Sequence, residues 1–281
     1  MKIRIGFWNV LRKLSNLEVP ITELIKENAL DVLCFAETGT TSDQVHTIAN
    51  FISKHTNTNW EMPHPSPPLT RRTEIISHLP KSYIATKTVD QYYTSFTLQG
   101  PNIDLLVFVV HFPSLLHKDR TDLNMTIRRQ ADKIRKEFLS SKVSGYFVLG
   151  DFNLNPYDEA LIGADGFNAT NDRQIVLRQQ RTIDGISYPY TYNPCWALLG
   201  QENGNVPGSY YLNSPGGTFQ HWHTLDQVIF CPNAVKSYVE KSICRIIKIG
   251  STDLLRMDKT GVTRINESTS DHLPLIFEID I

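Results

Sequence analysis

The sequence has few of the features that mark secreted, membrane-spanning or disulfide-rich proteins. Only four of its 281 residues are cysteine, and none forms a C-x-x-C pair, so buried free thiols are expected rather than disulfides or a zinc site. The longest purely apolar run, residues 105–110, is far too short to cross a bilayer. The opening segment MKIRIGFWNV alternates charged and apolar side chains and lacks a signal-peptide core. We therefore expect a cytoplasmic protein without membrane insertion.

The chain also lacks an excess of charge of either sign. Its 28 basic and 29 acidic residues leave a net charge of −1 with histidine neutral. Tight, sequence-independent binding of long duplex DNA usually needs many Lys and Arg contacts to phosphates. The composition argues against such a clamp, although it leaves room for a local basic cleft.

Short apolar runs flanked by polar residues predict strands along the whole chain. The first run, KIRIGFW, alternates and places Ile3, Ile5 and Phe7 on one face. Further strands are predicted at residues 31–37, 103–111, 145–151, 225–231 and 273–281.

Helical signals lie between these strands. The clearest helix is predicted at residues 121–140, where apolar residues recur at steps of three or four. Pro20 suits a first helical turn, and Thr41 with Gln44 forms a possible capping box. The proline-rich residues 61–70 are predicted to form a surface loop, and residues 200–222 a long irregular loop. The mixture of strands and helices predicts an α/β (α+β) architecture.

Polar residues recur where the predicted strands end or begin. Each one alone is explained as a turn or cap residue. Unrelated turns would not repeatedly select carboxylate, amide and imidazole groups, so we expect these side chains to converge at one edge of a sheet. They are Asn9, Glu37, His111, Asp151, Asn153, Asp226, Asp271 and His272.

The motifs around these residues occur in the order WNV, AET, VVHF, GDFN, LDQV and SDHLP. In this order they resemble the motifs of the endonuclease/exonuclease/phosphatase superfamily. The resemblance covers residues 7–274 and implies one domain over residues 1–281, with a deoxyribonuclease I-like fold. That fold is a four-layer sandwich of two packed mixed β-sheets flanked by helices, with the site at one end. The segments YNPCWALLG and LDQV, with a Gly-rich loop between them, are similar to bacterial members of unassigned substrate.

The resemblance implies hydrolysis of phosphoester bonds with Mg²⁺ or Mn²⁺. Glu37 is the implied principal metal ligand, with Asn9 and Asp271 in the same metal shell, and a carboxylate suits such a hard cation. Asp151 is the implied residue that orients or deprotonates the attacking water, and Asn153 the one that hydrogen-bonds the phosphate. As residues i and i+2 of a strand, these two side chains are predicted to point the same way.

His272 is implied to face the phosphate, held in tautomer and orientation by Asp226. The pair is either cationic and stabilises the transition state, or serves as an acid or base. His111 matches a histidine of the deoxyribonuclease and sphingomyelinase branches, and either protonates the leaving oxygen or binds phosphate.

Other polar and aromatic residues have weaker claims. His221 and His223 could form a metal pair, but without further ligands a loop or an aromatic contact cluster fits better. The aromatic residues of the long loop could stack on bases or pack the loop onto the body: Tyr210, Tyr211 and Trp222. Paired arginines are assigned to exposed positions, with a phosphate contact as the alternative for the second pair: Arg128–Arg129 and Arg71–Arg72.

Three functions fit these observations. The first is a metal-dependent phosphodiesterase, either a nuclease or a nucleotide phosphodiesterase, and the near-neutral charge favours a short, single-stranded or small nucleotide substrate. The second is a phosphatase or phosphodiesterase for a small phosphorylated metabolite or a lipid headgroup, although no membrane-binding amphipathic helix is evident. The third is a catalytically silent binding protein, which should have lost motif residues that this chain retains.

Overall fold

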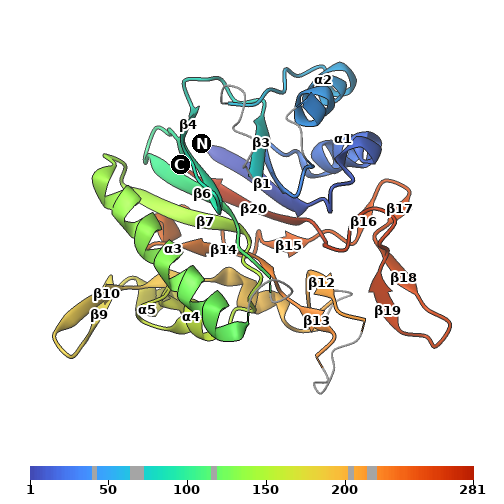
Figure 1. The fold of residues 1–281 in the computed structure, drawn as a ribbon. Helices are drawn as coiled ribbons and strands as arrows, with labels where there is room; N and C mark the ends of the chain where they lie inside the picture. Colours follow the sequence, from blue (N-terminus) through green and yellow to red (C-terminus); the bar gives the residue numbers. More distant parts are fainter. Residues whose placement is uncertain (40–42, 64–72, 115–118, 202–205, 214–219) are drawn as a thin grey trace.

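The computed structural model describes residues 1–39, 43–63, 73–114, 119–201, 206–213 and 220–281. Within these ranges two large mixed β-sheets pack against each other (Figure 1). The first sheet has the order β15 (Cys244–Arg245), β20 (Leu275–Asp280), β1 (Lys2–Asn9), β2 (Val32–Ala36) and β3 (Thr73–Ser77). The second has the order β4 (Ile84–Val89), β5 (Tyr93–Leu98), β6 (Leu105–His111), β7 (Gly145–Asp151), β14 (Asp226–Phe230), β11 (Thr191–Tyr192) and β8 (Ala169–Thr170).

Helices cover the outer face of each sheet (Figure 1). On the first sheet, α1 (Glu18–Asn28) and α2 (Asp43–Thr56) pack their apolar sides against outward-facing residues such as Trp8. On the second sheet lies α3 (Arg120–Ser140), whose apolar stripe is buried as its periodicity predicts. The Asp119 side chain caps this helix by accepting a hydrogen bond from the Asp122 amide. The four layers of the predicted sandwich are therefore confirmed.

The inner faces of the two sheets share one apolar core. Ile3, Ile5 and Phe7 belong to it, whereas Trp8 points to the helical side, as the alternation in β1 predicts. Phe277 of the first sheet meets Phe147 of the second, with ring centroids 5.7 Å apart. Burial of each such side chain contributes roughly 1.5–3 kcal/mol, so the packing of the two sheets is strongly favoured.

Shorter elements decorate this frame. Four two-stranded ribbons are described: β9 (Gln180–Ile183) with β10 (Ile186–Pro189), β12 (Tyr210–Tyr211) with β13 (Trp222–His223), β16 (Lys248–Ile249) with β17 (Thr252–Asp253), and β18 (Leu255–Met257) with β19 (Thr263–Ile265). The short helices are α4 (Glu159–Ile162), α5 (Arg173–Val176), and the 3₁₀ turns η1 (Leu14–Asn16), η2 (Pro194–Leu198) and η3 (Ala234–Lys236).

The long loop predicted at residues 200–222 is only partly irregular, because it contributes β12 and begins β13. Thr41, Arg71, Arg72 and most of the proline-rich stretch lie outside the described residues. All four cysteines are free thiols, as predicted, and three of them are buried. Among the described residues we find no helix with the length and apolar character needed to cross a membrane.

Candidate active site

The pairing of the central strands brings the polar residues at their ends together. Asn9 ends β1, His111 ends β6 and Asp151 ends β7, whereas Asp226 begins β14. Asp151 is in register with His111 on the parallel neighbour and with Asp226 on the antiparallel neighbour. Asn9 is in register with Ala36, the residue before Glu37. One edge of the packed sheets therefore carries an amide, an imidazole and three carboxylates.

A glycine fixes the backbone that leads into Asp151. Gly150 has a φ of +145°, and a Cβ placed there would lie 2.1 Å from the Val110 carbonyl oxygen. No other residue fits this close approach between β6 and β7. The glycine in the motif GDFN thus sets the position of the carboxylate that follows it.

Asn153 does not continue the strand, so the prediction that it points the same way as Asp151 in a strand register is wrong. Its φ of +52° places it in the left-handed region, where asparagine is tolerated better than most residues. The Asp151 carboxylate accepts a hydrogen bond of 2.8 Å from the Asn153 backbone amide. The Asn153 side chain donates to the Phe112 carbonyl at 2.9 Å. The turn after β7 is therefore closed by both side chains.

The amide of Asn9 joins two carboxylates. Its Nδ2 donates to Glu37 Oε1 at 3.2 Å and to Asp151 Oδ2 at 3.1 Å. His111 Nε2 lies 3.5 Å from the same Glu37 oxygen and 3.8 Å from Asp151 Oδ2. Glu37 has a φ of +54°, and its carbonyl accepts from the Arg12 amide at 2.7 Å. Glu37 is thus presented from a constrained turn, with about a quarter of its side chain (26%) exposed.

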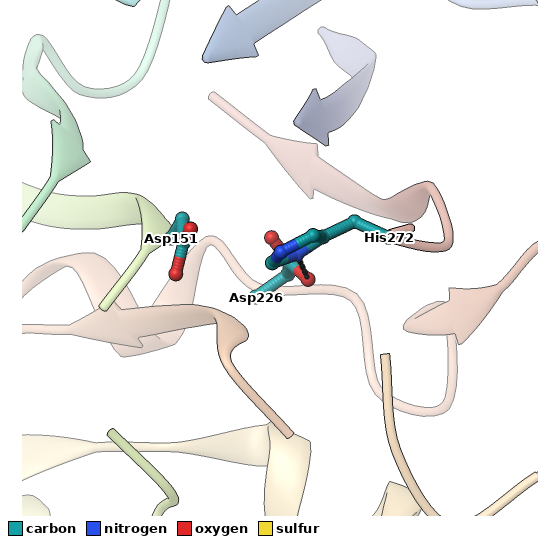
Figure 2. A group of neighbouring side chains, drawn as sticks. All are labelled: Asp151, Asp226 and His272. Atoms are coloured by element: carbon teal, nitrogen blue, oxygen red, sulfur yellow. Dashed lines mark hydrogen bonds and ion pairs between the residues drawn. The ribbon is translucent and has the colours of Figure 1, made fainter. Parts of the chain in front are cut away.

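Asp226 and His272 form a buried pair. His272 Nδ1 and Asp226 Oδ2 are 2.8 Å apart, and Figure 2 shows this hydrogen bond with the Asp151 side chain beside the pair. The His272 backbone is held by the Trp8 indole, which donates to its carbonyl at 2.9 Å. Ser270 Oγ accepts from the His272 amide at 3.1 Å and donates to the Asn9 carbonyl at 2.6 Å.

The pKa values of both His272 and Asp151 are raised, by neighbouring carboxylates for His272 and by burial for Asp151. Burial alone would lower the pKa of His272, but Asp226, Asp151 and Asp271 outweigh it and raise the pKa to about 10. Burial and the nearby Asp226 raise the pKa of Asp151 to about 7, although His272 and hydrogen bonds to Asn153 and Asn9 oppose the rise. Burial also raises the pKa of Asp271, and His272 partly offsets this increase.

The chemistry of the site fits a hard divalent cation. Asp226 Oδ1 and Asp271 Oδ1 are buried without a hydrogen-bond partner among the described residues, and such oxygens are normally satisfied. Ligand-type atoms of Asp151, Asp226 and His272 lie within 4.8 Å of one another. Within this group His272 Nδ1 is already hydrogen-bonded to Asp226 Oδ2, whereas Asp226 Oδ1 remains as an oxygen ligand. Oxygen ligands are what Mg²⁺ and Mn²⁺ prefer.

The weaker candidates of the sequence have structural partners. His223 Nδ1 is 3.0 Å from Asn155 Nδ2, and His221 Nδ1 is 2.8 Å from the Leu212 carbonyl. Burial lowers the pKa of His223. Arg128 pairs with Asp165 at 3.0 Å. Tyr211 and Trp222 pack on the helical side of the first sheet, whereas the Tyr210 ring lies 5.1 Å from that of His272.

Sequence reasoning missed the residues that fix the backbone at His272 and Asp151. Trp8 and Ser270 contact the backbone on either side of His272, and Gly150 sets Asp151. Each one lies inside a quoted motif or directly beside it. The motifs therefore contained these residues, but their contacts become visible only once the strands are paired.

Comparison with known proteins gives matches at the level of structure alone. No protein-family model and no curated protein sequence matches the chain. A family protein of the endonuclease/exonuclease/phosphatase type from Leptotrichia buccalis has a TM-score of 0.56 and 14% identity, covering 99% of this chain and 100% of that one. D. rerio TDP2 complexed with single-strand DNA product has a TM-score of 0.55 and 14% identity, with 100% and 99% covered.

A third similar structure is the 3′ phosphatase NExo from Neisseria bound to a product DNA hairpin. Its TM-score is 0.54 and its identity 14%, covering 99% of this chain and 100% of that one. Likeness at such identities concerns the arrangement of the chain in space. The protein therefore shares the deoxyribonuclease I-like fold of these structures.

Proposed function

We propose that the protein is a divalent-metal-dependent phosphoester hydrolase, acting as a phosphodiesterase on nucleic acid or a nucleotide. The observation that carries this proposal is the Asp226–His272 pair beside Asp151, which Asn9 links to Glu37. Phosphodiesters repel nucleophiles through their charge, so catalysis needs charge neutralisation, an activated water and help for the leaving oxygen. This arrangement offers a group for each need.

Side-chain oxygens of the site would hold the metal. Glu37 would be the principal ligand, with Asn9 and Asp271 beside it. A bound Mg²⁺ or Mn²⁺ would supply Lewis-acid neutralisation of a phosphate oxygen. Asp271 Oδ1 is buried and has no hydrogen-bond partner in the described ranges, which supports this assignment because a cation would satisfy it.

Asp151 is assigned as the group that orients and deprotonates the attacking water. A general base works best when its pKa lies near the working pH, and burial raises the pKa of Asp151 to about 7. Asn9 and the Asn153 amide hold its two oxygens in place. Asn153 donates one side-chain N–H to the Phe112 carbonyl, and its second N–H can donate to a phosphate oxygen.

His272 is assigned to the phosphate. Its Nδ1 faces Asp226, so Nε2 is the atom that can donate to a phosphoryl oxygen. The Asp226 carboxylate stabilises the imidazolium, which places a fixed positive charge where negative charge develops. His111, beside Glu37 and Asp151, is assigned to the leaving oxygen or to phosphate binding.

Two of the similar structures favour nucleic acid as the substrate. The TDP2 structure holds single-strand DNA product and the NExo structure a DNA hairpin. The net charge of −1 favours a short or single-stranded substrate over a long duplex. Because NExo is described as a 3′ phosphatase, removal of a terminal phosphate is the second candidate function.

A substrate panel with Mg²⁺ and with Mn²⁺ tests these proposals. It contains plasmid DNA, single-stranded DNA, RNA, a 3′-phosphorylated oligonucleotide, phosphoinositides, a sphingomyelin analogue and a bis-aryl phosphodiester. We expect the highest kcat/KM on a single-stranded oligonucleotide, with or without a terminal phosphate, and loss of turnover in His272→Ala. Preference for a phosphoinositide or for the sphingomyelin analogue would overturn the substrate assignment. Absence of turnover on every phosphoester with either metal would indicate a binding protein.

A further inference from the structure

A buried serine lies between the two chain segments that carry the Asp226–His272 pair. Ser209, directly before β12, has no exposed surface. Its Oγ accepts hydrogen bonds from the Leu225 amide at 3.1 Å and from the Asp226 amide at 3.0 Å. A hydroxyl oxygen has two lone pairs, so this single side chain satisfies two successive backbone donors where β14 begins.

The backbone of the same residue binds the segment that carries His272. The Ser209 carbonyl accepts from the Leu273 amide at 2.8 Å. Tyr210 forms an isolated antiparallel bridge with His272, and their ring centroids are 5.1 Å apart. Ser209 thus contacts the residue beside His272 through its main chain and Asp226 through its side chain.

The segment before Ser209 is built for close approach. A Cβ on Gly208 would lie 2.6 Å from the His223 carbonyl oxygen, so glycine allows β12 to approach β13. The Ser209 amide donates to that carbonyl at 2.8 Å. With the segment fixed in this way, the Ser209 hydroxyl has little freedom to leave the two amides it serves.

We propose that Ser209 is a positioning residue for the Asp226–His272 pair. Its hydroxyl fixes the backbone at Asp226, which sets the direction from which the carboxylate meets His272 Nδ1. Alanine would leave the Leu225 and Asp226 amides without their buried acceptor, and the start of β14 would shift. Small displacements of a catalytic group lower the rate of the chemical step more than substrate binding. The kinetic part of this inference rests on the proposed function.

Ser209→Ala and Ser77→Ala test the role as a matched pair. Ser77 is equally buried and its Oγ also accepts a backbone amide, that of Leu79 at 3.0 Å, but it lies at the opposite end of β3 from the site. We expect kcat to fall about 10-fold or more in Ser209→Ala with KM changed less than about 2-fold. Ser77→Ala should lower thermal stability alone. Ser209→Cys keeps a weak acceptor in a similar volume and should fall between wild type and alanine, and it replaces alanine if that variant does not fold.

A spectroscopic measurement separates this inference from the proposed function. The proton shared by His272 Nδ1 and Asp226 should give a downfield ¹H resonance that is lost in His272→Gln. We expect this resonance to move or broaden in the Ser209 variants and to remain in Ser77→Ala, even if no phosphoester is turned over. An unchanged resonance and unchanged kcat in a folded Ser209 variant would overturn the positioning role.

Discussion

His272 and Asp226 share a 2.8 Å hydrogen bond in the protein interior, although they are 46 positions apart in the chain. Asp226 begins β14 of the second sheet, and His272 lies just before β20 of the first. The pair therefore joins the two sheets, and its geometry depends on how they pack. The Trp8 indole, also from the first sheet, donates to the His272 carbonyl and holds His272 on its own sheet.

Replacement of Asp226 by Asn should impair catalysis more than folding. The amide removes the negative charge that favours protonated His272 and offers a donor where the imidazole needs an acceptor. We expect kcat to fall by about 10²–10⁴-fold, the range attributed to a positioned acid or base. Steady-state kinetics on the best panel substrate measures the change. Asp253→Asn, an exposed carboxylate, is the control, and normal kcat in Asp226→Asn would exclude the assigned role.

The contribution of His272 to stability should depend on pH in a defined direction. Burial lowers the pKa of His272, but the surrounding carboxylates raise it to about 10, above the ordinary value of about 6.5. A pKa raised on folding contributes stability that is fully present below the unfolded value and is lost as pH rises through the folded value. Below about pH 6.5 the free energy of unfolding of the metal-free wild type should therefore exceed that of His272→Gln by the largest amount.

Urea unfolding of both proteins at a series of pH values measures this difference. The gap in free energy of unfolding between wild type and His272→Gln should narrow as pH rises from about 6.5 towards about 10. His46→Gln, at an exposed position of α2, is the control for loss of an imidazole far from the Asp226–His272 pair. A gap that stays constant or widens with pH would contradict the charge balance described for the pair.

Gly150→Ala should destabilise the protein and reduce its activity together. The φ of +145° and the 2.1 Å approach of a Cβ to the Val110 carbonyl leave no space for alanine. We expect a loss of about 2–3 kcal/mol in the free energy of unfolding, or about 3–5 °C in Tm. Calorimetry measures it. Gly200→Ala is the control, because a Cβ there would meet no atom of the described residues within 4 Å. Equal Tm values for the two variants would refute the steric argument.

Local sequence patterns predicted the central strands of both sheets and the longest helix, because these depend on periodicity, but β3, β4 and β5 were not predicted. The strand predicted at residues 103–111 is β6 (Leu105–His111), and the helix predicted at residues 121–140 is α3 (Arg120–Ser140). Apolar alternation and a repeat of three to four residues arise from neighbouring positions. The polar residues at strand ends were found by the same local signals.

Contacts between distant segments could not be predicted in this way. The bridge between Tyr210 and His272 depends on the register of a two-residue strand inside a Gly- and Pro-rich loop. The left-handed backbone of Asn153 overrides the strand register expected from its spacing. A local turn signal was also missed: Asp184 and Gly185 form the turn between β9 and β10, and Asp-Gly is a common hairpin turn.

Glu37→Gln should abolish metal-stimulated hydrolysis while leaving the fold intact. Glutamine keeps an oxygen that can accept from Asn9 but removes the charge that a hard cation needs. Metal binding to wild type should raise Tm with metal concentration, because a ligand that binds only the folded state stabilises it. We expect this rise to be lost in Glu37→Gln and turnover to fall at least about 100-fold.

Glu159→Gln, with 75% of its side chain exposed, is the control. Since the Tm measurement needs no substrate, it tests the ligand assignment even if the preferred phosphoester differs from nucleic acid. Full metal-stimulated turnover in Glu37→Gln would remove this residue from the metal site.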